Sequence, residues 1–195
     1  MEENTLSPTQ TILLTKQLLI SGIDFLLENT DFEQIIIPCC YGNHARTTQR
    51  SRIASGFKNN FEWMMYKDLE FHYKNNSKIK FEVANAYHTF VNVYDKYLIR
   101  FHHGDAIRFA GGVGGLTIPV NKAIAQWNKS IPAYLDVFGH WHTSLEGGNF
   151  VSNGSLVGYN PYASFIKASF EVPQQAMFVI NEEYGKILSA PIFLT

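Results

Sequence analysis

The chain has few cysteines and almost no net charge, and both shortages exclude classes of protein. Its two cysteines, Cys39 and Cys40, are adjacent, so they provide no disulfide framework of the kind that staples small secreted domains. The net charge is −1 with histidine neutral, which gives no global basic field for a nucleic acid or a membrane surface. We therefore expect a protein of a reducing, cytoplasmic compartment.

Signals for secretion and for membrane insertion are also missing. Met1 is followed by acidic and polar residues instead of a basic segment and an apolar run, so we expect no signal peptide. The uninterrupted apolar runs are far shorter than the about 20 residues of a membrane span. The sequence thus predicts no membrane partner.

Residues that build a core are plentiful. Of the 195 residues 46% are hydrophobic, including 15 Phe and 10 Tyr. A chain of this size and composition can bury a substantial core. We expect one globular domain over residues 1–195.

Two segments carry the signals of helices. Ser7 stands at an N-cap, Pro8 at the first helical position and Gln10 at the capping-box position, which predicts a helix that continues to about Glu28. Apolar residues at helical spacing predict a second long helix over about 49–73.

Apolar runs bounded by turn residues predict strands. The predicted strands are "EQIIIPCC" (33–40), "IKFEVA" (79–84), "TFVNVYDKYLIRFHH" (89–103, two strands around a turn at Asp95–Lys96) and "YLDVFG" (134–139). A helix carrying Val120, Ile124 and Trp127 lies before the last of these. The fold class that follows is α/β, with mixed β-sheets flanked by helices.

Three clusters of chemically useful residues follow predicted strands, and each contains a glycine beside a candidate metal ligand. They are "YGNHAR" (41–46), "FHHGDA" (101–106) and "FGHWHT" (138–143). Strand ends that converge at one sheet edge are where α/β proteins assemble sites. Imidazole nitrogens together with amide or carboxylate oxygens suit Zn, Mn, Fe or Ni. Four of the seven histidines fall in the last two clusters, so we predict a divalent metal centre.

The histidine spacing refines this prediction. His140 and His142 are one residue apart, and alternate residues of an extended chain point the same way, so both could face one metal centre. His102 and His103 are adjacent and should point to opposite faces, so at most one of them is a ligand. The alternative is that these are ordinary hydrogen-bonded strand or surface histidines.

The motifs "GNH", "HG" and "GHxH", in this order and each at a strand end, resemble the later motifs of the calcineurin-like metallophosphoesterase family. "FVSNGSLVGY" (150–159) resembles the Asn-Gly-Ser strand that follows the last of them. The resemblance covers roughly residues 34–159. It implies an αββα sandwich that is incomplete at its N-terminus, and a phosphomonoester or phosphodiester substrate, such as a nucleotide or a nucleic acid.

The resemblance also implies roles for individual residues. Asn43, His103 and His140 would bind the second of two metal ions, and His142 would bind the first. His44 would be the catalytic imidazole near the scissile phosphate. In that mechanism the two metals hold the phosphate and lower the pKa of a bridging water that attacks in line.

Two features depart from the family pattern. The earlier motifs, Asp-x-His and Gly-Asp, are absent upstream of "GNH", and with them the aspartate that bridges both metals. The resemblance therefore implies the C-terminal portion of a metallophosphoesterase, with an incomplete dinuclear site and exposed sheet edges that promote self-association. Alternatives are a catalytically inactive binding or structural module, and a protein with one weak metal site.

The second departure follows the "GNH" histidine. Ala45 stands where many members have an acidic residue that orients the imidazole. Arg46 comes next and could contact phosphate oxygens, which makes it a candidate substrate-binding residue. An ordinary solvated basic segment is the other interpretation.

Overall fold

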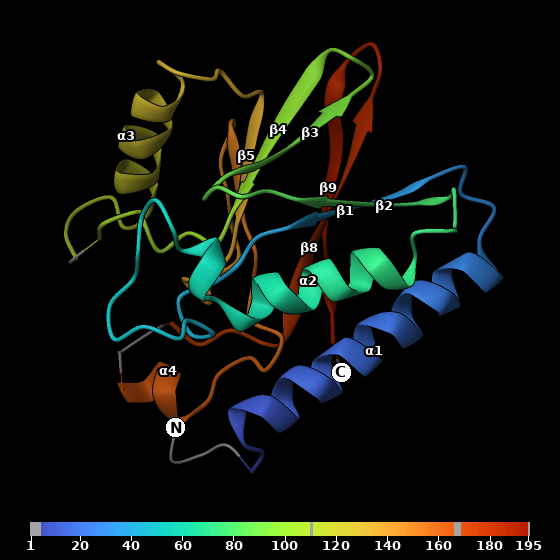
Figure 1. The fold of residues 1–195 in the computed structure, drawn as a ribbon. Coiled ribbons are helices and arrows are strands. Elements are labelled where there is room, and N and C mark those ends of the chain that lie inside the picture. Colours follow the sequence, from blue (N-terminus) through green and yellow to red (C-terminus); the bar gives the residue numbers. More distant parts are fainter. Residues whose placement is uncertain (1–4, 110, 166–168, 195) are drawn as a thin grey trace. The chain divides into compact units, whose positions relative to one another are not determined.

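The computed structural model describes residues 5–109, 111–165 and 169–194 (Figure 1). Its contacts divide the chain into two compact units, Met1–Thr89 and Phe90–Thr195. Each unit has a hydrophobic core of its own. The organisation as one domain stays a prediction.

The first unit begins with helix α1 (Pro8–Asn29), which starts where the capping box predicts. Ser7 Oγ accepts a hydrogen bond from the backbone N–H of Gln10, and Gln10 Oε1 accepts one from the backbone N–H of Ser7. These bonds satisfy two backbone donors that a helix start would otherwise leave unpaired. The sequence prediction is confirmed here to within one residue at each end.

Helix α1 also bears on the prediction that the chain has no membrane partner, which stays a prediction. By length and composition alone it could cross a membrane, although uninterrupted apolar runs in the sequence are short. Core helices and signal sequences meet the same criterion. In the described residues only 6% of the most apolar stretch of α1 is buried, and Leu18 and Phe25 are more than 60% exposed.

Two parallel strands and a second helix complete the first unit. Strand β1 (Ile35–Cys39) pairs in parallel with β2 (Ile79–Val83), with Ile37 opposite Phe81. Helix α2 (Phe61–His72) packs on this pair and on α1. The buried core residues of this unit are Ile23, Cys39, Met65, Leu69, Tyr73 and Phe81.

The start of α2 differs from the sequence prediction. We expected a helix from about residue 49, but residues 47–56 form bends and turns, and a short 3₁₀ helix, η1 (Phe57–Asn59), precedes α2. Asn60 Oδ1 accepts hydrogen bonds from backbone N–H groups in the first turn of α2. Asparagine favours such caps over helix interiors, so the helix begins after Asn60 and not before it.

The second unit is built on a five-stranded sheet. Its strands, in spatial order, are β3 (Thr89–Val93), β4 (Tyr97–His102), β5 (Leu135–Phe138), β7 (Phe150–Ser152) and β6 (Leu145–Glu146). β4, β5 and β7 are parallel neighbours, whereas β6 is antiparallel to β7. The sheet is therefore mixed. The tight turn between β3 and β4 has positive φ at Tyr94 and Asp95, as hairpin turns of the mirror-image type require.

Both faces of this sheet are covered. Val120 and Ile124 of helix α3 (Thr117–Trp127) pack with Phe138 and Phe150 on one face. The hairpin of β8 (Gln174–Asn181) and β9 (Gly185–Phe193) packs against Leu135 on the other face. A short helix, α4 (Pro161–Phe165), follows β7. The predicted fold class, α/β with mixed sheets flanked by helices, is confirmed.

Candidate metal centre

Two of the predicted ligands lie together in the second unit. His103 directly follows β4 and His140 follows β5, and these strands are parallel neighbours, so their carboxyl ends share one sheet edge. His140 Nδ1 lies 3.2 Å from His103 Nε2, with the ring centroids 5.0 Å apart. The structure therefore joins the second and third sequence clusters, as strand-end convergence predicts.

Glycines allow this close approach. The backbone N–H of Gly139 donates to the carbonyl of His103 at 3.1 Å. Gly104 has φ +113°, and a Cβ at this position would lie 2.7 Å from the carbonyl oxygen of Gly139 and 3.1 Å from Cβ of His140. Only glycine fits both the backbone angle and the space. The glycines beside the histidines thus set the distance between the two imidazoles.

The arrangement of His140 and His142 differs from the expectation. β5 ends at Phe138, and both histidines have left-handed backbone angles, φ +70° and +51°. The alternation of an extended strand therefore does not apply to them. Trp141 packs onto the core beneath α3, beside Phe109, while the His142 ring lies 5.9 Å from that of Tyr162. Such backbone angles in non-glycine residues are concentrated at functional sites.

Neighbouring segments hold the loop that carries these histidines. Ser152 Oγ donates to the carbonyl of Thr143 at 2.9 Å, and the backbone N–H of Ser144 donates to Glu171 Oε2 at 2.8 Å. The backbone N–H of Asn153 donates to the carbonyl of Phe138 at 2.7 Å. The "SNG" segment (152–154), which begins at the last residue of β7, therefore supports the histidine loop.

A buried polar cluster that the sequence analysis missed lies under α3. Arg100 donates to Asp136 through Nε at 2.7 Å and through Nη2 at 2.9 Å, and both residues are 1% exposed. Arg100 Nη2 also donates to Asn128 Oδ1 at 2.9 Å. His102 Nε2 lies 3.5 Å from Asp136 Oδ1, and its ring stacks on Phe138. The sequence did contain a signal for this cluster, because the neighbouring apolar strands β4 and β5 each contain one charged residue, Arg100 and Asp136. Buried charges need partners of opposite sign, so these two side chains could have been expected to pair.

Charges in this cluster are set by burial and by the ion pair. Burial lowers the pKa of His102, and the Asp136 carboxylate only partly opposes this. Burial alone would raise the pKa of Asp136, but the approach of His102 and the hydrogen bonds and charge of Arg100 outweigh it, so this pKa is lowered. His102 is therefore neutral and buried, and its ring packs beside Phe138 and Trp127.

The remaining predicted site residues lie in the first unit, on the loop after β1. Asn43 is half-buried, whereas His44 and Arg46 are exposed. Arg46 Nη1 donates to the backbone carbonyl of Asn43, and the backbone N–H of Phe61 donates to the carbonyl of Ala45. In this structure the Arg46 guanidinium thus binds its own loop.

Helix α2 supplies an acidic residue to this loop. Glu62 Oε2 accepts a hydrogen bond from the backbone N–H of Gly42, while Asn60 Nδ2 donates to the Gly42 carbonyl at 2.7 Å. Burial raises the pKa of Glu62, and the Gly42 bond and the charge of His44 act against that rise. Glu62, which sequence reasoning did not identify, is therefore an acidic residue that helps to hold the loop carrying His44.

The donor set fits a metal ion only in part. Within the described residues no group of three or more His, Cys, Asp or Glu side chains could hold a metal ion, so His103 and His140 stand as a pair. Two imidazoles can bind a borderline ion weakly when water completes the coordination. Burial raises the pKa of Cys39 and of Cys40 to about 12, so neither thiol is ionised at neutral pH in the metal-free protein. The ligand roles of Asn43 and His142 stay predictions.

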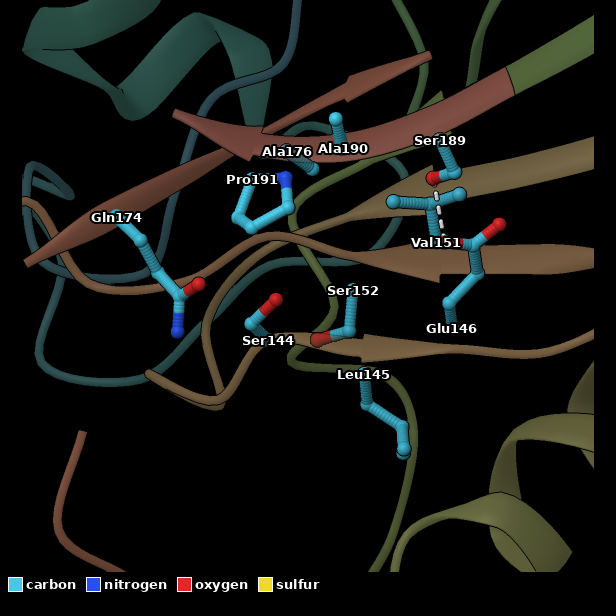
Figure 2. Close-up of a pocket in the computed structure, with 10 residues that line it drawn as sticks. All are labelled: Ser144, Leu145, Glu146, Val151, Ser152, Gln174, Ala176, Ser189, Ala190 and Pro191. Atoms are coloured by element: carbon cyan, nitrogen blue, oxygen red, sulfur yellow. Dashed lines mark hydrogen bonds between the residues drawn. The ribbon is translucent and has the colours of Figure 1, made fainter. Parts of the chain in front are cut away.

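A cavity of about 110 Å³ lies at the end of the histidine loop, between β6, β7 and the β8–β9 hairpin (Figure 2). Ser144, Ser152 and Ser189 line it. Glu146, also in its wall, accepts hydrogen bonds from Lys186 and from Ser189 Oγ. The cavity is too small for a substrate, and its carboxylate already has partners, so we assign it no catalytic role.

No protein-family model matches the chain, and neither does any curated protein. The chain is similar to two solved structures of Vps29 from Entamoeba histolytica. One is the wild-type protein complexed with Zn²⁺, at 14% identity and a TM-score of 0.39, covering 81% of this chain and 97% of that chain. The other is a single mutant, at 13% identity and a TM-score of 0.38, covering 82% and 98%. Both TM-scores lie below 0.5, so the fold class rests on the helices and strands described above.

Proposed function

We propose that this chain supplies histidine ligands to a metal-dependent phosphoesterase centre that hydrolyses phosphomonoesters or phosphodiesters. The observation that carries the proposal is the pairing of His103 and His140, 3.2 Å apart at the sheet edge. A bound divalent ion such as Mn, Fe, Zn or Ni would polarise a phosphoryl oxygen and lower the pKa of a bound water.

The residues of the chain itself would share the remaining work. Gly104 and Gly139 hold the two imidazoles close, and the buried pair of Arg100 and Asp136 fixes the strands behind them. His44 is exposed, as a residue that protonates a leaving oxygen must be. Arg46 would bind phosphate oxygens after leaving the Asn43 carbonyl, in the bidentate geometry that guanidinium allows.

The setting of the centre belongs to the same proposal. The substrate class extends to nucleotides and nucleic acids, and the compartment is the cytoplasm. Asn43 and His142 would complete the ligand set. Self-association through unpaired sheet edges would bring together groups that one chain lacks.

Hydrolysis of bis(4-nitrophenyl) phosphate with added Mn²⁺ tests this function. We expect activity in the wild-type chain that falls at least about a hundredfold in His140→Ala, because one of two imidazoles is lost. His72→Ala, at an exposed position in α2, is the matched control and should keep the activity. Equal rates in the wild type and in His140→Ala would overturn the proposal.

A second function is favoured by one observation. Within the described residues the histidine pair has no third His, Cys, Asp or Glu to complete a metal site. A non-catalytic module that binds one metal ion weakly needs nothing more. This alternative predicts metal binding that depends on His103 and His140, without hydrolysis.

A further inference from the structure

The first unit contains a cavity that is independent of the histidine pair. It lies between α1, α2 and β1 and has a volume of about 410 Å³. Its walls are mainly apolar and include Leu19, Ile23, Met65, Leu69 and Phe81. A volume of this order, lined in this way, is typical of small-molecule sites.

One charged side chain faces this apolar space. Among the described residues that line the cavity, Glu62 is the one that carries a charge. One of its oxygens, Oε2, accepts the backbone N–H of Gly42, which fixes the carboxyl group at the wall. Tyr66 also lines the cavity, and burial raises its pKa, so its hydroxyl stays neutral.

A carboxyl group at the wall of an apolar cavity loses hydrogen bonds to water, and a ligand with a polar group can replace them. Burial raises the pKa of Glu62, which reflects the cost of an anion in these surroundings. A cation in the cavity would offset that cost through a charge-assisted hydrogen bond. An anionic ligand would be repelled by the Glu62 carboxylate, and a neutral ligand would leave the cost of burying that charge unchanged. His44, whose charge acts on the pKa of Glu62, is exposed to water.

We propose that this cavity binds a small amphiphilic organic cation, with its ammonium group on Glu62 and its apolar body against α1 and α2. The apolar walls supply affinity, because they remove the alkyl body from water. The carboxylate of Glu62 supplies selectivity for the charge of the head group.

Three probes with the same alkyl chain test the proposal by calorimetry: n-octylammonium, n-octanol and n-octanoate. We expect octylammonium to bind most tightly and octanoate most weakly. Glu62→Gln keeps an acceptor for the Gly42 N–H and removes the charge. It should weaken octylammonium binding by about tenfold and leave octanol binding unchanged. The matched control is Glu33→Gln, an exposed position in the same unit, which should change neither affinity.

A second variant locates the ligand and does not depend on the folding of Glu62→Gln. Leu19 lines the cavity and is 38% exposed, so Leu19→Phe can fill the space without disrupting the core. Leu19→Phe should weaken the binding of octylammonium and of octanol to the same extent. Octanoate binding as tightly as octylammonium, no binding of any probe, or full affinity in Leu19→Phe would each overturn the proposal. None of these outcomes bears on the metal centre in the second unit.

Discussion

His140 Nδ1 lies 3.2 Å from His103 Nε2, although 37 positions separate the two residues in the sequence. Their approach follows from the parallel pairing of β4 with β5, which places both strand ends at one edge. The glycine after His103 and the glycine before His140 then let the two loops touch. A pair of imidazoles at this distance is the observation that suggests metal chemistry.

Gly104→Ala should disrupt this pair. The added Cβ would lie 2.7 Å from the Gly139 carbonyl oxygen, at a backbone φ of +113° that favours glycine. We expect a loss of about 1–3 kcal/mol in the free energy of unfolding. Urea denaturation measures it. In the control Gly148→Ala the new Cβ meets nothing within 4 Å, so a loss as large as in Gly104→Ala would contradict this account.

Asp136→Asn should be among the most destabilising conservative substitutions in the second unit. It leaves the guanidinium of Arg100, 1% exposed, without its charge partner. Breaking a buried pair in this way costs about 3–5 kcal/mol. The control is Glu146→Gln, which breaks the more exposed pair with Lys186 and should cost less than about 1 kcal/mol. Urea denaturation measures both losses of unfolding free energy. Similar losses in the two variants would show that burial of the ion pair does not determine how much its removal destabilises the protein.

The stability of the second unit should fall in mild acid because of His102. Burial lowers the pKa of this imidazole below its ordinary value of 6.5, so the unfolded chain takes up a proton there before the folded chain does. The contribution of the neutral His102 imidazole to the free energy of unfolding is therefore complete above pH about 6.5. It decreases as the pH falls toward the folded-state pKa. We expect wild-type protein to lose more unfolding free energy between pH 7 and pH 5 than His102→Asn. The exposed variant His72→Asn should follow the wild type.

Both cysteines should react slowly with thiol reagents in the folded protein. Only the thiolate reacts, and burial raises the pKa of Cys39 and of Cys40 to about 12. At pH 8 we expect iodoacetamide labelling about a thousandfold slower than for an exposed cysteine, rising about tenfold per pH unit toward pH 11. Urea-unfolded protein is the control. Folded protein that reacts as fast as unfolded protein would contradict the raised pKa values of the two thiols.

Local signals in the sequence were sufficient for many of the elements. The capping box at Ser7 and Gln10 placed the start of α1, and apolar runs bounded by turn residues placed β2 and β4. The predicted start of α2 was wrong because the side chain of Asn60 caps the helix. The periodicity of apolar residues does not reveal such a cap. Element types were therefore easier to predict than their ends.

The candidate site was predictable only in part, for a physical reason. Glycines beside histidines at strand ends indicated where His103 and His140 would meet. The positive φ of His140 and His142, on either side of the core residue Trp141, is not determined by the spacing of the histidines alone. Glu62 was missed because its link to Gly42 is a contact between residues 20 positions apart.

We propose above all that the histidine pair, His103 and His140, binds a divalent ion. Titration of the protein with Co²⁺, followed by its visible absorption, measures this directly and also reports the coordinating atoms. We expect saturable binding at one site per chain that is lost in His103→Ala and in His140→Ala and retained in His72→Ala. No saturable binding by the wild-type protein, or equal binding by all the variants, would contradict the claim.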